Sequence, residues 1–317
     1  MTAPLQPLSA ALAEATARRA PLRAQLEAED TDAWRIFHGV AEGRPGLSID
    51  RYGPLLLAQI WFDPPSAAER AAVEDALGAV FWRTRGEALP TSPLVELREG
   101  GLRYGVRAAH DGIDPFLFLD LRPARRWIAQ NSAGKSVLNA FAYTCGAGLA
   151  AASGGARRVL NLDHAARWTA VGRENSARNG LPMQHLELDY FAAVRQMAGL
   201  PVGGRRGQTR RPPRVAPARF DLIILDPPTL ARSPWGTVDI VEDYPSLFKP
   251  AWSALAEGGA LLATNHAPGV AIDDWIGRCR RCAEKAGRPV RDVEIIDGEA
   301  DFPSFDGAPP LKVAVFR

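Results

Sequence analysis

The stretch Val137-Leu-Asn-Ala-Phe-Ala-Tyr-Thr-Cys-Gly-Ala-Gly148 decides the fold of this chain. It opens with alternating apolar residues that predict a buried strand, and it then turns through small residues into an Ala-rich helix over 149–153. Gly146 and Gly148 would let a ligand approach the backbone closely. The N-terminus of the helix would offer N–H groups and a partial positive charge. The stretch therefore predicts a nucleotide-type site at the carboxyl end of a strand in an α/β protein.

A second predicted strand, Arg158-Val-Leu-Asn-Leu-Asp163, ends in a carboxylate suited to binding the two hydroxyls of a ribose. Together with the preceding turn, it indicates a site for a cofactor that contains adenosine. The spacing Gly146-x-Gly148-x-x-Ala151, with Asp163 downstream, also fits a loose dinucleotide fingerprint. These residues alone therefore leave a dehydrogenase open.

The motif Asp226-Pro-Pro-Thr229 helps to decide whether the enzyme is a dehydrogenase. It ends the predicted strand 220–226, whose apolar run 222–225 is typical of a parallel strand buried on both faces. Pro227 and Pro228 impose a rigid, extended turn without N–H donors. The carbonyls of this turn and the Asp226 carboxylate can accept hydrogen bonds from the amino edge of a planar base. A methyltransferase acting on a nucleobase uses such an arrangement and a dehydrogenase does not, so the sequence favours a methyltransferase.

Predicted strands and helices alternate after residue 113, which indicates a mostly parallel sheet with helices on both faces. We expect strands over 137–142, 158–163, 185–188, 220–226, 259–264, 290–296 and 311–316. We expect helices over 120–133, 149–154, 165–179, 243–256 and 272–286. Only a loop separates the last two strands, so an antiparallel pair is predicted at the end of the chain.

The first 112 residues have a different character. Residues 4–29 are Ala-rich with leucines at helical spacing, and Pro21 within them predicts two short helices or one kinked helix. Residues 32–63 predict a small antiparallel sheet, Ser66 caps a helix over 66–82, and residues 90–107 predict strands around a Gly100-Gly101 turn. We therefore predict an N-terminal helical segment (1–30), a small β-rich α+β domain (31–112) and a Rossmann-like α/β domain (113–317).

The composition is that of a globular protein, with 46% hydrophobic and 23% charged residues among 317. The net charge is +2, so a nucleic-acid surface would have to come from local clusters of the 38 basic residues. We expect no membrane span and no signal peptide, because no apolar window is long enough and the N-terminus carries Glu14. Three cysteines do not make a disulfide framework, and we expect a cytoplasmic protein.

Residues 199–219 interrupt the alternation with a Gly- and Pro-rich segment that contains no acidic residue. Its arginines are Arg205, Arg206, Arg210, Arg211, Arg214 and Arg219. This composition is typical of a solvated, disordered insertion, and it also suits a flexible arm that contacts phosphates. Both interpretations stay open.

Further motifs occur together in a characteristic order. They are Phe116-Leu-Phe-Leu-Asp-Leu-Arg122, Asn139-Ala-Phe-Ala-Tyr-Thr144, Asp163, Glu174-Asn-Ser-Ala-Arg-Asn-Gly-Leu181, Asp189 and the segment 220–229. Upstream lie Thr31-Asp-Ala-Trp-Arg35, the segment 43–53 and Gly101-Leu-Arg-Tyr-Gly-Val106. This set resembles the bacterial 23S ribosomal RNA methyltransferases of the large-subunit family, in which a small β-rich domain precedes the catalytic domain. The resemblance implies a class I methyltransferase fold, S-adenosylmethionine as the cofactor and RNA, first of all 23S ribosomal RNA, as the partner.

The sequence departs from that family in three places. The small domain leaves no room before it for the PUA domain, the RNA-binding module that starts the 5-methylcytosine members. Those members attack the base with a cysteine, but the corresponding segment here, Ala263-Thr-Asn-His-Ala-Pro268, contains none. This segment and Thr229 are more similar to the guanine-N7 branch of the family. Finally, Cys145 stands where the family usually has glycine.

The resemblance implies a role for each matching position. Asn139, Phe141, Tyr143, Gly146 and Gly148 would surround the methionine part of the cofactor, Asp163 would bind its ribose, and Asp189 its adenine amino group. Asp120, Arg122 and Arg126 on the entering helix would face the same site. Asp226, Pro227, Pro228 and Thr229, together with Asn265, would hold the acceptor. A guanine N7 is already nucleophilic, so transfer would depend on positioning rather than on a strong base, and the base would have to leave its stack.

Several other residues have two interpretations. Cys279 and Cys282 have zinc-like spacing, but two more ligands would be needed, so packing is the favoured interpretation and no metal is expected. His266, Trp235 and Tyr244 would either contact the substrate or only pack. Two alternatives to an RNA methyltransferase also stay open: an acceptor that is a protein or a small molecule, and an RNA-binding protein without turnover. The oligomeric state is not indicated.

Overall fold

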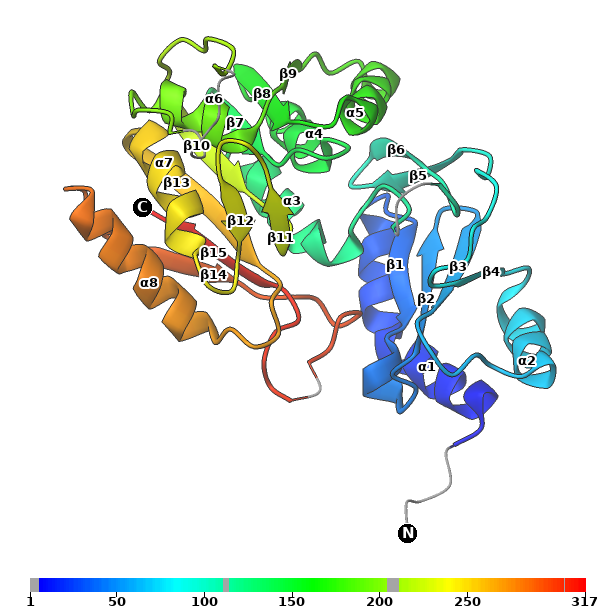
Figure 1. Ribbon diagram of the computed structural model, residues 1–317. Helices are drawn as coiled ribbons and strands as arrows, with labels where there is room; N and C mark the ends of the chain where they lie inside the picture. Colours follow the sequence, from blue (N-terminus) through cyan, green and yellow to red (C-terminus); the bar gives the residue numbers. More distant parts are fainter. Residues whose placement is uncertain (1–5, 111–113, 204–210, 305) are drawn as a thin grey trace. The chain divides into compact units, whose positions relative to one another are not determined.

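The computed structural model describes residues 6–110, 114–203, 211–304 and 306–317 (Figure 1). The chain forms two compact units. The first unit contains Met1–Arg122 and Gly298–Pro309, and the second contains Pro123–Asp297 and Pro310–Arg317. The predicted domain boundaries after residues 30 and 112 stay predictions; these units divide at Arg122, and the first regains a segment from near the end of the chain.

The second unit is built on a seven-stranded sheet in the order β14-β15-β13-β10-β7-β8-β9. Its strands are β7 (Ser136–Ala140), β8 (Arg158–Asp163), β9 (Gln184–Glu187), β10 (Phe220–Leu225), β13 (Leu255–Asn265), β14 (Val293–Ile296) and β15 (Lys312–Phe316). The pairs from β9 to β13 are parallel, whereas β15 is antiparallel to both of its neighbours. The prediction of a mostly parallel Rossmann-like sheet with an antiparallel last strand is confirmed.

Side chains alternate between the two faces of this sheet, so both faces carry buried side chains. Helices cover each face. The helices are α3 (Arg122–Gln130), α4 (Gly146–Ser153), α5 (Ala166–Asn179), α6 (Tyr190–Met197), α7 (Tyr244–Ala254) and α8 (Ile272–Lys285). Leu138 and Ala140 join a core with residues of α6, α7 and α8. The intervening Asn139 and the neighbouring Asn161 point to the opposite face, where α4 packs. The sheet is therefore buried on both sides, as the apolar run of β10 predicts.

The first unit combines a four-stranded sheet, a hairpin and two α-helices. Its elements are α1 (Leu8–Ala28), β1 (Ala33–Phe37), the 3-10 turn η1 (Gly39–Glu42), β2 (Leu47–Tyr52), β3 (Leu55–Ile60), α2 (Ala67–Leu77), β4 (Phe81–Thr84), β5 (Val95–Glu99), β6 (Leu102–Val106) and the 3-10 turn η2 (Leu119–Leu121). Leu8 and Leu12 of α1 pack against this sheet in one apolar core.

Pro21 lies inside a single helix, which agrees with the second of the two alternatives in the number of helices. The strands within residues 32–63 pair antiparallel, as predicted. The structure differs at α2, which ends at Leu77, well before the predicted end at residue 82. The chain then crosses over to β4, which pairs in parallel with β3 and makes the four-stranded sheet mixed. Ser66 does cap α2, in a reciprocal capping box with Glu69.

Two elements of the second unit were not expected from the sequence. Helix α6 follows β9 directly, and the short hairpin of β11 (Leu230–Arg232) and β12 (Thr237–Asp239) follows the Pro-Pro motif. Each is too short to show a clear hydrophobic period on its own. Among the described residues, no helix has both the length and the apolar character that crossing a membrane requires.

Candidate functional site

Most predicted site residues of the second unit lie where the parallel strands end. The loop 141–145 follows β7, Asp163 ends β8, Asp189 follows β9, Asp226 follows β10 and His266 follows β13. Because these strands run parallel and are neighbours, their carboxyl ends share one edge of the sheet. The order of strands reverses between β7 and β10, which is where α/β sheets bind ligands.

The loop after β7 has an uncommon backbone. Phe141, Tyr143 and Cys145 have φ values of 57°, 49° and 64°, in the left-handed region that favours glycine. Each such residue costs of the order of 1–3 kcal/mol and persists only where its surroundings hold it. Alternation of left-handed and ordinary conformations turns backbone N–H groups toward one side and favours the binding of negatively charged or oxygen-rich groups. The strain thus marks this loop as a candidate binding site.

Asp163 holds that loop in place through backbone contacts. Its Oδ2 accepts a hydrogen bond from Tyr143 N at 2.9 Å, and its Oδ1 accepts one from Ala165 N at 2.9 Å. The side chain is 10% exposed. A carboxylate offers about four acceptor positions, so these two bonds leave it able to accept hydroxyl groups as well. Asp163, the residue predicted to bind the ribose, therefore also ties the loop after β7 to the end of β8.

The structure gives a reason for a glycine at position 148 that the sequence did not indicate. A Cβ on this residue would lie 2.1 Å from Asn161 Oδ1, so the glycine makes room for that side chain. Asn161 in turn accepts a hydrogen bond from Asn139 Nδ2 at 2.9 Å, and both amides are buried. Asn139 and Gly148 thus belong to one packed contact beneath the loop, between β7, β8 and α4.

Cys145 is accommodated in the place of the expected glycine. Its side chain is fully buried, and a Cβ on Gly172 of α5 would lie only 2.3 Å from its sulfur. Burial, and secondarily the charge of Asp163, raises the pKa of this thiol far above its ordinary value. The thiol is therefore neutral near pH 7, which argues against a role as a nucleophile.

Aromatic residues flank the same loop. Phe141 stacks on Tyr190 with ring centroids 4.6 Å apart, and Tyr143 meets Trp168 edge to face at 5.1 Å. Asp189 caps α6, since its Oδ1 accepts a hydrogen bond from Ala192 N at 2.9 Å. The N-cap residue of α4, Cys145, makes no side-chain capping hydrogen bond. An N-terminus without this cap can bind water or a ligand through its first-turn amides.

The predicted acceptor motif projects from the end of β10. Asp226 accepts a short hydrogen bond from the Thr264 hydroxyl, and the Thr264 carbonyl accepts one from Tyr244 at 2.8 Å. Pro227 is buried, whereas Pro228 and Thr229 are exposed. The Thr229 hydroxyl lies 2.6 Å from His266 Nε2. The structure therefore joins the motif to the loop after β13 and exposes its far end.

Asn265 lies at the same edge but is fully buried. Its Nδ2 donates to the Ile240 carbonyl at 3.0 Å, and its Oδ1 accepts from Ala267 N at 2.9 Å. This side chain supports the two loops around it instead of facing outward. We therefore treat Asn265 as a residue that positions the acceptor loops.

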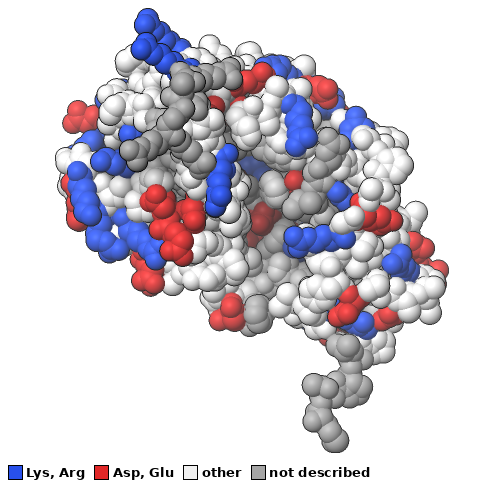
Figure 2. Space-filling view, viewed as in Figure 1, with Lys and Arg blue, Asp and Glu red and all other residues white. Residues whose placement is uncertain are grey.

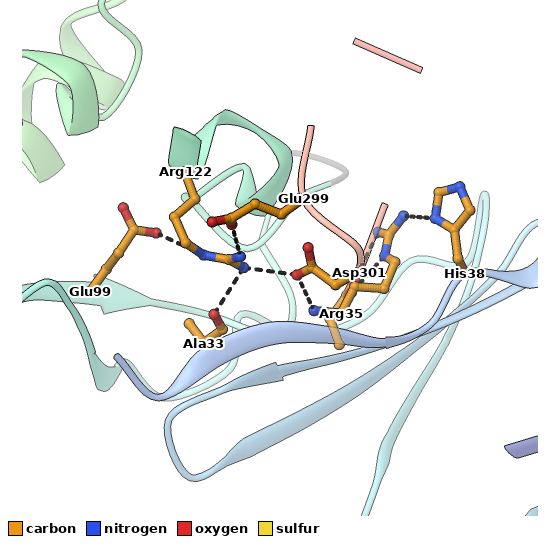
Figure 3. Close-up of polar contacts among 8 residues, drawn as sticks. Ala33, Arg35, His38, Glu99, Arg122, Glu299 and Asp301 are labelled. Carbon is orange, nitrogen blue, oxygen red and sulfur yellow. Dashed lines mark hydrogen bonds and ion pairs between the residues drawn. The ribbon is translucent and has the colours of Figure 1, made fainter. Parts of the chain in front are cut away.

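Asp120 and Arg122 belong to the first unit. Arg122 is 2% exposed and lies among carboxylates (Figure 3). Its Nη2 donates to Asp301 Oδ2 at 2.9 Å and to the Ala33 carbonyl at 3.1 Å, its Nη1 donates to Glu299, and its Nε lies 3.9 Å from Glu99. These contacts give Arg122 a structural role within the first unit, and its predicted role in the cofactor site stays a prediction.

The remaining singled-out residues pack in the interior or lie near the surface. Cys279 and Cys282 are buried in α8, and the described residues contain no group of three or more His, Cys, Asp or Glu side chains placed to hold a metal. Tyr244 is buried. Arg205, Arg206 and Arg210 lie outside the described residues. The ends of that insertion are tied to α6, since Gln196 bonds to both Pro213 and Val215.

Comparison with known proteins shows the family to which this chain belongs. The sequence profile of S-adenosylmethionine-dependent methyltransferases matches residues 75–317, well over half of the chain. The chain belongs to the S-adenosylmethionine-dependent methyltransferase family. The protein is therefore a methyltransferase, and the cofactor predicted from the strand-end motifs is confirmed.

Two curated relatives of this methyltransferase carry related names. It is 32% identical to a ribosomal RNA large subunit methyltransferase of Deinococcus radiodurans, over 88% of this chain and 71% of the relative. It is 27% identical to the ribosomal RNA large subunit methyltransferase I of Aeromonas hydrophila, over 88% of this chain and 72% of that one. The large-subunit family predicted from the motifs is thus confirmed.

A solved structure shares the whole fold of this methyltransferase. SMU.776, a candidate methyltransferase crystallised with S-adenosylhomocysteine, superposes with a TM-score of 0.78 at 23% identity, covering 100% of this chain and 83% of that one. This likeness concerns the fold alone.

The residues of the strand-end site fit the cofactor in chemical terms. Asp163 and Asp189 supply carboxylate acceptors for hydroxyl and amino donors at the ends of adjacent strands. The N-terminus of α4, which follows the strained loop, has the N–H orientation and the partial positive charge that suit a carboxylate. The assignment of Asn139, Phe141, Tyr143, Gly146, Gly148, Asp163 and Asp189 to individual parts of the cofactor stays a prediction.

Proposed function

We propose that this methyltransferase modifies a base of 23S ribosomal RNA and that Asp226, Pro227, Pro228 and Thr229 receive the base. The observation that carries the proposal is the rigid Asp-Pro-Pro-Thr turn at the end of β10. Strand β10 pairs directly with β7, which the strained loop follows. The relatives named above support RNA as the acceptor, because both are named as methyltransferases of large-subunit ribosomal RNA.

The thiols of the chain favour a nitrogen acceptor over cytosine C5. Methylation of C5 in this family uses a cysteine thiolate, but the three cysteines here, Cys145, Cys279 and Cys282, are all buried. Burial raises the pKa of each thiol above its ordinary value. A neutral, buried thiol neither reaches a base nor attacks it. We therefore propose a guanine-N7-like acceptor.

The chemistry that we propose requires positioning more than proton transfer. When bound, S-adenosylmethionine supplies a methyl group on a sulfonium centre, and this group passes to the nitrogen lone pair as the S–CH₃ bond breaks. Asp163 and the loop after β7 would fix the donor side, and Asp226 and Thr229 would hold the base in line with it. A base inside a duplex would first have to leave its stack.

Contacts to the rest of the RNA would come from local groups of arginines. On the face shown in Figure 2, basic side chains are interspersed with acidic ones and do not form one continuous field. Arg211 and Arg214 are exposed at the described end of the insertion, which is fixed to α6. We propose that these arginines contact phosphates and that the protein acts in the cytoplasm, where the ribosomal RNA is.

The test is transfer of labelled methyl groups from S-adenosylmethionine to total RNA from a strain that lacks this gene. Nuclease-treated and protein fractions are measured alongside. We expect label in large-subunit RNA, and digestion to nucleosides should show a methylated guanine. Label confined to protein or to small molecules would contradict RNA as the acceptor, and label in cytosine would contradict the proposed atom.

A further inference from the structure

Two loops of the second unit meet at the exposed end of the Asp-Pro-Pro-Thr turn. The Thr229 carbonyl accepts a hydrogen bond from Ile240 N at 3.2 Å, and the Thr229 hydroxyl lies 2.6 Å from His266 Nε2. Both the backbone and the side chain of Thr229 are therefore held, the first by the loop after β12 and the second by the loop after β13.

A buried layer lies beneath this exposed pair. Asn265 bridges the two loops, since it donates to the Ile240 carbonyl and accepts from Ala267 N. Lys312, the first residue of β15, donates from Nζ to the Ala267 carbonyl at 2.9 Å. Both polar groups of Ala267 are thus held by side chains that are 0% and 3% exposed. The residue that immediately follows His266 is therefore fixed through both of its peptide groups.

Burial of these polar side chains costs folding free energy, and the hydrogen bond of the exposed pair offsets little of that cost. Burial disfavours the charged amine of Lys312 and lowers its pKa. Replacing a buried polar or charged side chain by an apolar one of similar volume is often neutral or stabilising. A hydrogen bond between exposed side chains such as Thr229 and His266 adds little stability. The arrangement therefore serves the placement of the exposed pair.

We propose that His266 is a positioning residue for methyl transfer: it orients the Thr229 hydroxyl toward the acceptor, and Asn265 and Lys312 hold His266 in the required place. The proposal rests on the acceptor site proposed above. In this arrangement His266 acts through Thr229, and the described contacts of Asn265 and Lys312 run through the backbone of Ala267 and Ile240.

The first experiment is a double-mutant cycle on the full-length enzyme with the large-subunit RNA acceptor. His266→Leu and Thr229→Val should each lower kcat by about 10- to 100-fold, with the KM for S-adenosylmethionine unchanged. His266→Gln and Thr229→Ser, which can restore the hydrogen bond, should recover most of the rate. If the two residues act as one unit, His266→Leu with Thr229→Val is no slower than the slower single variant. Losses that multiply, or an unchanged kcat in either single variant, would overturn the proposal.

The second experiment separates positioning from folding. Lys312→Met keeps the volume of the buried stem and removes the amine. We expect an equal or higher melting temperature together with a kcat lowered by about 10-fold, and no further loss when His266→Leu is also present. Lys249→Met, at an exposed position on α7, is the matched control and should change neither quantity. An unchanged kcat in Lys312→Met would remove this residue from the proposed network.

These outcomes are distinct from failure of the proposed function. If the wild-type enzyme methylates a protein or a small molecule and not RNA, the RNA assignment fails, and the same variants are measured with that acceptor. Coupled losses there would support the positioning role, and independent losses would contradict it.

Discussion

Arg122 in the first unit and Asp163 in the second are both charged side chains with little exposure, and they are held in opposite ways. Arg122 is enclosed by the carboxylates of Glu99, Glu299 and Asp301 and by one carbonyl (Figure 3). Asp163 is held by the backbone amides of Tyr143 and Ala165.

The difference separates a structural charge from a binding charge. Protein acceptors bind both terminal nitrogens of Arg122, and its neighbouring carboxylates raise its pKa despite burial. Backbone amides fix the orientation of Asp163 and still leave acceptor positions on its oxygens. A ligand that donates hydrogen bonds can therefore add to Asp163, whereas a ligand that accepts them would have to compete with protein acceptors at Arg122.

Breaking the Arg122 cluster should have the largest effect on stability. Arg122→Met leaves three poorly exposed carboxylates without their cation, so we expect a loss of about 3–5 kcal/mol in the free energy of unfolding. Urea unfolding followed by fluorescence measures this loss. Arg23→Met is the matched control, because Arg23 is paired with Glu27 at the surface and should cost at most about 1 kcal/mol. A stable Arg122→Met enzyme that had lost affinity for S-adenosylhomocysteine would support the predicted role of Arg122 in the cofactor site.

Removal of the proposed acceptor carboxylate should affect turnover and not cofactor binding. We expect Asp226→Ala to lower kcat by about 100- to 1000-fold, because a preorganised group at the acceptor is lost. Single-turnover transfer to RNA and calorimetric titration with S-adenosylhomocysteine measure the two properties separately.

Asp226→Asn provides the control for the supporting contact. An asparagine oxygen can still accept from the Thr264 hydroxyl, so this variant separates the charge from the local packing. Full activity in Asp226→Asn would show that the carboxylate charge is not needed. Full activity in Asp226→Ala would remove the residue from the mechanism.

Asp163→Ala should show the reverse pattern. It removes the acceptors predicted to bind ribose and also releases Tyr143 N, so we expect affinity for S-adenosylhomocysteine to fall by about 100-fold. The matched control is Asp221→Ala. Asp221 accepts a hydrogen bond from the backbone amide of Ser136, which begins β7, whereas Tyr143 lies in the loop after the other end of this strand. Equal losses of affinity in the two variants would indicate a general effect on β7 and contradict a direct role.

The smallest expected effect is a pH dependence in the first unit. Burial, with the nearby Arg35, lowers the pKa of His38 from 6.5 to about 4. The unfolded chain therefore binds the proton more readily, and the His38 contribution to stability is lost as pH falls from about 6.5 toward 4. His38→Asn should reduce the slope of unfolding free energy against pH in this window. His164→Gln, at a residue with a 76% exposed side chain, should leave the slope unchanged.

The sequence was sufficient to predict the fold class because its signals are local. The apolar run of β10 and the small-residue turn after β7 each identify a strand and its end, and strand ends in parallel order place Asp163, Asp189 and Asp226 at one edge. The antiparallel end of the sheet followed from the presence of only a loop, and no helix, between the last two strands. The structure confirms the fold, and the family match confirms the cofactor and the enzyme class.

The partners of these residues could not be predicted in the same way. Arg122 matches a family motif, but its counter-charge Asp301 lies 179 residues further along the chain. Gly148 is typical of a ligand loop, yet Asn161 on the next strand explains it. Lys312 carries no signal in the sequence, because its importance comes from burial and from the loop beside it. Periodicity reports which face of an element is apolar, and it does not report which distant side chain meets that face.

The return of Gly298–Pro309 to the first unit has a consequence for the order in which the protein is completed during synthesis. When the ribosome has released residues 1–297, the strands and helices of the first unit are all present, but Glu299 and Asp301 are not. Of the three carboxylates described around Arg122, Glu99 is then the one already synthesised. The beginning of the chain therefore reaches its final ionic balance only when almost the whole protein has been translated, and the second unit has by then received all but its last strand.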